Sequence, residues 1–358
     1  MSINHIYHTW FSRIEQLWPI LRVTQMRNLA WLLVGIYRSR SVHLNDIAGQ
    51  IPGRAKLVSL TRRLSRFLDN PAIRVRDMYE PIARALLQAA AQAGVIRLIV
   101  DGTKIGFGHQ LLIVALAYRR RALPIAWTWV KGPKGHSTAI KQRALLAYVR
   151  QLLPPSVPVV LVGDCEFGAV EVLKQVEQWH WHYVLRQPAS HLIDLTLHNH
   201  WQRFGDVVQQ PGQSRWLGRG FLTREHVHST WLLAHWQTGE DEPWLLATNL
   251  PSPTETLRTY RWRSWIEEMF GDMKRHGFDL ESTHLHHFSR LSRLTLAVAL
   301  LYVWLVSQGA QAIKNGQRHL VDRKDRRDLC IFQIGWRLVE RHLINSQPIS
   351  IRLCPSYW

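Results

Sequence analysis

Hydrophobic residues between positions 5 and 92 recur at the three- and four-residue spacing of amphipathic helices. The longest such stretches are IEQLWPILRVTQMRNLAWLLVGIYRS and MYEPIARALLQAAAQA. Between them, Pro52 and Gly53 separate two shorter amphipathic segments, and both residues interrupt helices. The pattern predicts an all-helical domain over residues 1–94 that contains a helix, a tight turn and a second helix.

The pattern changes at Val95, where short apolar runs begin to alternate with turns and helical segments. Because aliphatic and β-branched residues fill VIRLIVDGTKIG, HQLLIVALAYRR and RALPIAWTWVKG, these runs predict three meandering strands. A helix that ends at Pro154, the strand VPVVLVGDCEFG, another helix and the strand WHYVLRQP follow. This order is typical of a ribonuclease-H-like α/β catalytic domain, which we place at residues 95–290.

Residues 189–243 interrupt that order with polar segments and an alternation that favours short antiparallel strands. We interpret this region as a β-strand insertion in the catalytic domain. The strand PWLLATNL follows, and a long helix is predicted to begin near Thr254. Residues 291–358 predict a short helical tail, which we expect to serve in dimerisation.

The strongly positive net charge of the chain indicates a polyanionic partner. Lys and Arg number 45 against 26 Asp and Glu, which gives a net charge of +19. Three arginines lie on the second helix of the predicted helix-turn-helix: Arg62, Arg63 and Arg66. The outline predicts DNA binding by the N-terminal domain. Many helical hairpins share this pattern, so plain helical packing remains the alternative.

Composition excludes several other classes of protein. A 46% hydrophobic share with 20% charged residues excludes a disordered chain. The three cysteines lie far apart, which argues against a disulfide framework and a zinc ribbon. The longest apolar run, from Leu294 to Val306, is shorter than the ~20 residues of a membrane span. We therefore expect no membrane partner and, because the N-terminus lacks a secretory signal, a cytoplasmic location. The DGTKIGFG turn lacks the GxGxxG and P-loop spacings, so no nucleotide cofactor is expected.

Two aspartates are candidates for catalysis. Asp101 and Asp164 are each predicted to be the last residue of an apolar strand, followed by a turn that contains glycine. Neighbouring parallel strands end at the same edge of a sheet, where α/β proteins place their ligand-binding groups. A lone aspartate at such a position often serves only a turn. A third carboxylate is needed to indicate a site.

The segment YRWRSWIEEMFGDMK supplies that carboxylate if it forms one regular helix. At about 100° per residue, three polar residues fall within about 60° of Tyr260: Arg263, Glu267 and Lys274. Glu268 and Asp272 fall on the adjoining solvent face, and the apolar residues form the stripe opposite Tyr260. A hydroxyl, a guanidinium and an ammonium beside a carboxylate suit a DNA phosphate next to a metal site. The alternative is an ordinary amphipathic helix with an i, i+4 ion pair.

The spacing of these four residues, Tyr-x2-Arg-x3-Glu-x6-Lys, resembles the signature of the insertion-sequence IS-four family of DDE transposases. IVDGTKIG around Asp101 and LVGDCEFG around Asp164 resemble the segments that carry the first two catalytic acids of that family. The similarity covers about residues 45–310. Cys165 and Glu166 depart from it, because a basic or small residue is more usual after the second aspartate.

The resemblance implies that Asp101, Asp164 and Glu267 hold two Mg²⁺ ions, for which Mn²⁺ substitutes, in two-metal phosphodiester chemistry. It implies a bacterial insertion-sequence transposase that cuts double-stranded DNA at terminal inverted repeats, joins the 3′-hydroxyl ends to target DNA and acts as a dimer at synapsis. Tyr260, Arg263 and Lys274 would then grip phosphates.

Two further questions stay open. The insertion offers four tryptophans that could stack on an unpaired base or form its small core: Trp201, Trp216, Trp231 and Trp236. The alternatives to a transposase are a nuclease of the same fold without strand transfer, and a DNA-binding protein with an inactive catalytic domain.

Overall fold

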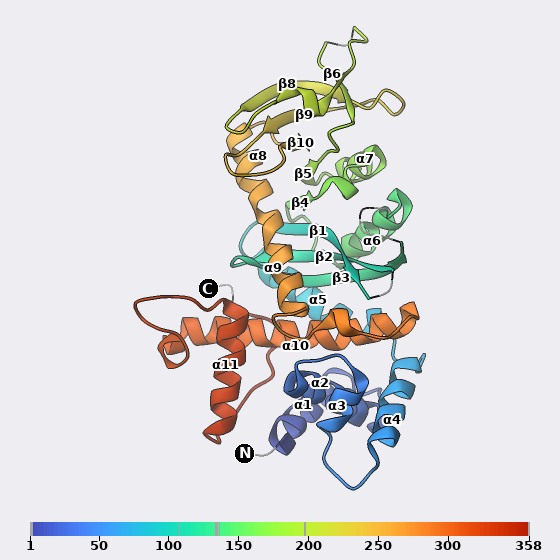
Figure 1. Ribbon diagram of the computed structural model, residues 1–358, viewed down its shortest axis with the longest axis vertical. Helices are drawn as coiled ribbons and strands as arrows, with labels where there is room; N and C mark the ends of the chain where they lie inside the picture. The colour runs from blue at the N-terminus through green and yellow to red at the C-terminus, as the bar shows by residue number, and fades with distance from the viewer. Residues whose placement is uncertain (1–2, 107, 133–134, 136, 197, 357–358) are drawn as a thin grey trace. The chain divides into compact units, whose positions relative to one another are not determined.

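The computed structural model describes residues 3–106, 108–132, 135, 137–196 and 198–356 (Figure 1). The chain divides into two compact units. The helical unit comprises Met1–Ala89, Ile105–His109 and Met269–Trp358. The sheet unit comprises Ala90–Lys104 and Gln110–Glu268.

Helices account for most of the helical unit, and the N-terminal helices that the apolar spacing predicts are present. The first five are α1 Ile3–Leu17, α2 Val23–Ser39, α3 Leu44–Gly49, α4 Leu57–Asp69 and α5 Val75–Ala91. The C-terminal part adds α10 Phe288–Lys314 and α11 Ile331–Ile344, with the 3-10 turns η4 Leu280–Ser282 and η5 Gln317–Leu320.

The core of the helical unit forms around α10. Every residue from Arg293 to Ala310 is buried. Trp10 of α1 and Tyr37 of α2 pack edge-on against Trp304, with ring centroids 5.3 and 5.7 Å apart. By length and composition α10 could also cross a membrane. Its burial among the other helices is that of a core helix, as its apolar run predicts.

Helices α10 and α11 cross so closely that glycine is required on both. A Cβ atom on Gly309 would lie 1.9 Å from the carbonyl oxygen of Ile331. A Cβ atom on Gly335 would lie 1.8 Å from the carbonyl oxygen of Leu305. Any larger residue would force the two helix backbones apart.

Two arginines of α10 hold the inner side of α4. Arg293 is buried and donates hydrogen bonds to the carbonyl oxygens of Leu68 and Ile73, at 2.7 and 3.0 Å. Arg290 donates to the hydroxyl of Ser65 at 2.7 Å. Hydrogen bonds from the two guanidinium groups of α10 therefore hold the last turn of α4 on its inner side. Charged donors make stronger hydrogen bonds than neutral ones.

The sheet unit contains a single ten-stranded sheet in the order β3-β2-β1-β4-β5-β10-β9-β8-β6-β7. The strands are β1 Ile96–Ile105, β2 His109–Tyr118, β3 Arg121–Lys131, β4 Val159–Gly163, β5 His182–Arg186, β6 Leu192–Asp194, β7 Gln202–Arg203, β8 Ser214–Leu222, β9 His228–His235 and β10 Trp244–Thr248. Between them run α6 Ala139–Leu152, η1 Cys165–Phe167, α7 Val170–Gln178 and η2 Phe204–Val207.

The centre of the sheet brings the two predicted aspartates to one edge. β1 pairs in parallel with β4, with Val100 opposite Gly163, and β4 pairs in parallel with β5. Asp101 and Asp164 each follow the last pair of this ladder. One expectation was wrong: Asp101 does not end its strand, because β1 continues to Ile105. β1 also neighbours β2 in the sheet, so its pairing does not stop where β4 stops.

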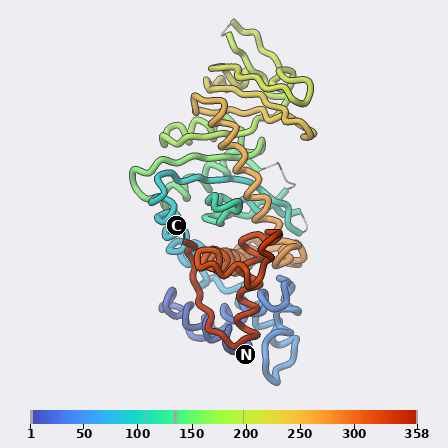
Figure 2. Tube along the Cα trace, turned by 90° about the vertical axis from the view of Figure 1, so that its left-hand side faces the viewer, coloured from blue at the N-terminus to red at the C-terminus, as the bar shows by residue number. Residues whose placement is uncertain are grey.

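The region of residues 189–243 contains the antiparallel strands that its alternation predicts. β8 pairs with β9 and β9 with β10, both antiparallel, so these strands extend the same sheet (Figure 2). Trp216 stacks on Trp231 across β8 and β9, with ring centroids 5.4 Å apart. The indole nitrogens of Trp201 and Trp236 donate to Asn199 and Glu240.

The signature segment is not one regular helix. α8 runs from Pro253 to Tyr260, a 3-10 turn (η3) covers Arg261–Arg263, and α9 covers Ser264–Met273. Rotation counted at 3.6 residues per turn is therefore wrong across the 3-10 turn. It is also wrong for Asp272, which is buried instead of facing solvent, because packing in the helical unit encloses it.

Candidate active site

Asp101 and Asp164 are oriented by their own backbone. Asp101 is only 1% exposed, and its Oδ1 accepts a hydrogen bond from the Gly102 amide at 2.7 Å. Asp164 caps η1, and its Oδ1 accepts from the Cys165 amide at 2.7 Å. Since each carboxylate is fixed through Oδ1, its Oδ2 is held in a defined direction.

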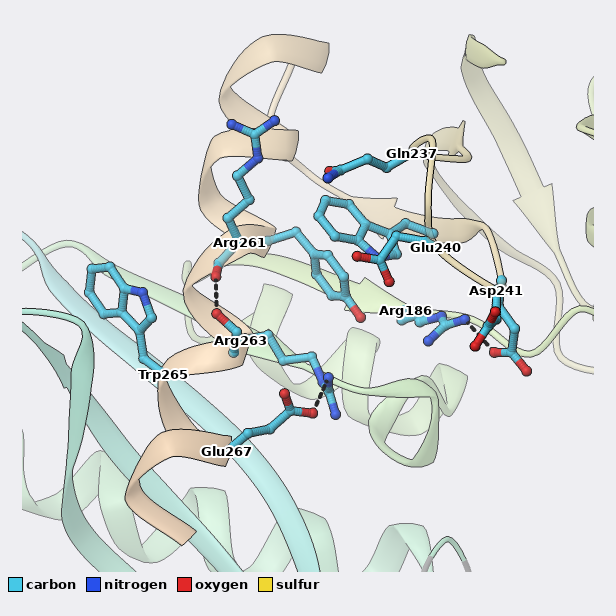
Figure 3. A pocket seen from close by; sticks show the side chains of 12 residues that line it. Arg186, Gln237, Glu240, Asp241, Arg261, Arg263, Trp265 and Glu267 are labelled. Carbon is cyan, nitrogen blue, oxygen red and sulfur yellow. Dashed lines mark hydrogen bonds and ion pairs between the residues drawn. The ribbon is translucent and has the colours of Figure 1, made fainter. Parts of the chain in front are cut away.

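Arg263 is the group on which both Oδ2 atoms converge. Its Nη2 lies 3.3 Å from Asp101 Oδ2 and 3.2 Å from Asp164 Oδ2. Its Nη1 lies 2.7 Å from Oε1 of Glu267, which is four residues further on, in α9 (Figure 3). The structure thus brings the three predicted acids together around one guanidinium.

The three carboxylates keep the Arg263 guanidinium in its charged form. The Arg263 side chain is 17% exposed. Burial alone would lower its pKa, but the charges of Asp101, Asp164 and Glu267, with Tyr260 contributing, outweigh burial and raise the pKa above its usual value. Arg263 therefore stays protonated at any physiological pH. Three carboxylates around one guanidinium still leave a local excess of negative charge.

The donor set fits a hard divalent cation. Mg²⁺ and Mn²⁺ prefer carboxylate oxygens, and here three carboxylates converge. In the described part of the chain, however, no group of three or more His, Cys, Asp or Glu side chains is close enough to hold a metal ion. The guanidinium of Arg263 lies at the point of convergence. The three carboxylates are the type of donor that a divalent cation prefers, and in this structure the guanidinium lies between them.

A cavity of about 950 Å³ opens beside Arg263 (Figure 3). Arg186, Arg261 and Arg263 contribute positive charge to its lining, and the turn at residues 240–242 contributes three acids. Arg186, the last residue of β5, pairs with Glu242 at 2.7 Å. The volume is that of a ligand site, and its arginines suit a phosphorylated ligand.

Two residues of the predicted phosphate-binding face have other surroundings. Tyr260 is 3% exposed and packs edge-on against Trp244, with ring centroids 5.0 Å apart. Burial raises the pKa of its phenol, which stays neutral. Lys274 belongs to the helical unit and pairs with Glu281 at 2.7 Å. The sheet unit thus groups Tyr260 with Arg263 and Glu267.

The two adjacent acids of α9 have different partners. Glu267 reaches Arg263, and its side chain is 51% exposed on the cavity side. Glu268 instead pairs with Arg121 of β3 at 3.0 Å. Glu267 is therefore the acid of this pair that shares a cation with Asp101 and Asp164.

Glu166 is central to a network that the sequence did not reveal. Its carboxylate accepts from Gln110 Nε2 at 2.8 and 2.9 Å and from the Ser137 amide at 2.9 Å. Gln110 packs over Gly102, where a Cβ atom would lie 2.3 Å from Gln110 Nε2. The network links the residue after Asp101 to the turn after Asp164. The only signal in the sequence was the unusual Cys-Glu pair.

The arginines of α4 belong to the helical unit and not to the carboxylate site. The helix-turn-helix outline is present as α3, a turn with Pro52 and Gly53, and α4. Arg62 and Arg66 are exposed. Arg63 and Arg66 line a hollow of about 480 Å³ with the first turns of α2. Within the described residues, the α4 arginines make no ion pair, and Nε of Arg63 is buried without a hydrogen-bond partner.

Comparison with known proteins shows the family of the chain. The model of a family described as the transposase DDE domain matches residues 97–304. The match covers more than half of the chain and includes all three converging acids. The chain therefore belongs to this family of transposases, enzymes that cut and join DNA.

One solved structure to which the chain shows similarity is the cryo-EM structure of a piggyBac transposase synaptic complex with hairpin DNA. It shares 9% sequence identity, the alignment covers 97% of this chain and 83% of that chain, and the TM-score is 0.46. No protein with a curated description matches the chain.

Proposed function

We propose that this chain is the transposase of a bacterial insertion sequence of the IS-four type, with Tyr260, Arg263, Glu267 and Lys274 as its signature. It cuts DNA at the terminal inverted repeats of the element and joins the 3′-hydroxyl ends to target DNA. The observation that carries the proposal is the convergence of Asp101, Asp164 and Glu267 on one cationic group, within a region that matches the DDE domain.

The fold of the catalytic domain is proposed to be ribonuclease-H-like, over residues 95–290. The strand order β3-β2-β1-β4-β5 supports this, as do the parallel pairs of β4 with β1 and β5. Residues 1–94 form the proposed DNA-binding domain, and residues 291–358 the proposed dimerisation region. Two DNA ends need two active sites, so we propose a dimer at synapsis.

Asp101, Asp164 and Glu267 are the proposed ligands of two Mg²⁺ ions, for which Mn²⁺ substitutes. When bound there, such ions polarise a phosphate and activate the attacking water or 3′-hydroxyl. The protein contributes preorganised oxygens. Asp101 and Asp164 are each fixed through Oδ1, so these two carboxylates need little reorientation. Arg263 is the proposed contact to a DNA phosphate.

Recognition of the element ends is assigned to α4. Arg62 and Arg66 point to solvent, and Arg63 borders the hollow beside α2. Charged contacts to DNA phosphates release counterions, so binding through this helix should weaken steeply with salt. Such a protein works on the nucleoid, in the bacterial cytoplasm.

The proposal is tested with purified protein, Mg²⁺ and a supercoiled plasmid that carries the inverted repeats flanking the gene. We expect breaks at the repeat ends, excised element and joined products, and none of these with Asp101→Asn. Breaks without joined products would favour a nuclease. DNA binding without breaks, in Mg²⁺ or Mn²⁺, would favour an inactive DNA-binding protein.

A further inference from the structure

Arg263 makes contacts that compete with metal binding. Its Nη2 shares Asp101 Oδ2 and Asp164 Oδ2, at 3.3 and 3.2 Å. These two Oδ2 atoms are the ones that face Arg263, whereas Oδ1 of each aspartate accepts a backbone hydrogen bond. Mg²⁺ needs its oxygens at about 2.0 to 2.1 Å. A divalent ion between these oxygens would meet the guanidinium, and two cations at that separation repel strongly.

The hydrogen bonding of Arg263 is also incomplete. Its Nε is buried and has no hydrogen-bond partner among the residues that the structure describes. A guanidinium presents its donors in a fork that matches the oxygens of a phosphate. The present contacts thus leave a donor that a phosphate could engage.

The surroundings leave space beside the Arg263 side chain. It ends the 3-10 turn between α8 and α9, and short 3-10 segments of this kind often mark a hinge. Its side chain also lines the 950 Å³ cavity, with Arg261 and Trp265 (Figure 3). The guanidinium therefore has open space beside the carboxylates into which it can turn.

We propose that Arg263 is an internal counter-ion that closes the carboxylate site until DNA arrives. Without DNA it neutralises part of the charge of Asp101, Asp164 and Glu267 and holds divalent ions off. A phosphate of the DNA end then draws the guanidinium away, and the freed oxygens bind metal. This inference rests on the proposed function and adds its regulation: DNA and metal each strengthen the binding of the other.

The test is Mn²⁺ binding to the full chain, measured from the electron paramagnetic resonance signal of the free ion. Without DNA, Arg263→Ala and Arg263→Gln should bind Mn²⁺ at least about tenfold more tightly than wild type. Gln keeps hydrogen-bonding capacity, so it preserves the test if Ala impairs folding. Arg261→Ala is the matched control: it removes the same charge from the same cavity wall and should change the affinity less than twofold.

A second arm adds a duplex with the sequence of the element end. Wild type should then bind Mn²⁺ at least tenfold more tightly, whereas Arg263→Gln should gain less than threefold. Equal Mn²⁺ affinity of wild type and both Arg263 variants, alongside metal-dependent cleavage by wild type, would overturn the counter-ion role alone. Absence of Mn²⁺ binding in all three proteins, with and without DNA, would overturn it together with the proposed metal site.

Discussion

Arg62 and Arg66 on α4 extend into solvent, whereas Arg263 is enclosed by three carboxylates. All three are arginines of a basic chain, and all three are proposed to meet DNA. The exposed arginines of α4 can contact a polyanion without first breaking an ion pair. Arg263 must first exchange its partners. An arginine without acidic neighbours is therefore available to DNA directly, whereas an arginine beside carboxylates must first leave them.

The support behind the two regions differs as well. α4 is held from behind by Arg290 and Arg293, which bind its inner side and leave its outer side free. Asp101 and Asp164 beside Arg263 are held by backbone amides, and the Glu166 network lies next to them. The support of α4 leaves its outer arginines exposed to solvent, whereas the carboxylates enclose the guanidinium of Arg263.

The largest effect is expected at the acids. Asp101→Asn, Asp164→Asn or Glu267→Gln should lower end cleavage by at least about 1,000-fold, the order found when a central catalytic group is removed. Binding of the DNA end should survive, because metal ligation needs ionised oxygens and folding does not. Gel analysis of plasmid cleavage measures this.

Glu268→Gln is the control for these variants, since its amide oxygen can still accept from Arg121. It should cut at nearly the wild-type rate. Full activity of Glu267→Gln together with loss of activity in Glu268→Gln would contradict the assignment of the third acid.

Removing the α4 charges should have the next largest effect, on binding instead of chemistry. The variant with Ala at positions 62, 63 and 66 should flatten the dependence of log K on log salt by about 0.9 per lost phosphate contact. Arg74→Ala removes an exposed charge that is already paired with Asp77, and should leave the slope unchanged. An unchanged slope in the triple variant, with native folding, would remove α4 from the DNA interface.

The order of helices and strands could be predicted from the sequence because it depends on local hydrophobic patterns. Apolar runs and helical spacing gave the strands around Asp101 and Asp164 and the long helix α10. The 3-10 turn at Arg261–Arg263 was not readable, since RWRS fits a helix as well as a turn. The convergence on Arg263 depends on which strands are neighbours, and the Glu166–Gln110 contact spans 56 residues. Contacts of that range leave no periodic signal in a sequence.

The difference in support predicts a third effect, on stability. Arg293→Met would leave the carbonyl oxygens of Leu68 and Ile73 without their donor, at about 1 to 3 kcal/mol for each buried group. Urea denaturation should show a loss of about 2 to 6 kcal/mol in the free energy of unfolding. Arg62→Met on the outer side should cost less than about 0.5 kcal/mol. Equal losses would mean that α10 does not hold α4.

The smallest effect is expected at Glu166. Glu166→Gln keeps one acceptor oxygen but loses the second, so the turn after Asp164 should shift slightly. Cleavage should fall by about tenfold, since a small misplacement near reacting groups is costly, while affinity for the DNA end should not change. Glu171→Gln, on the exposed side of α7, is the control and should have no effect. A loss of DNA affinity in Glu166→Gln would assign this residue to binding instead.

The central claim is that the acids around Arg263 carry out strand transfer as well as cleavage. The direct measurement supplies a pre-cut element end with a free 3′-hydroxyl, a supercoiled target plasmid and Mg²⁺, and scores covalent joining of end to target. The account predicts joined product with wild type and Glu268→Gln, and none with Asp101→Asn or Glu267→Gln. A wild-type protein that nicks and breaks plasmid DNA but never joins the pre-cut end would contradict it.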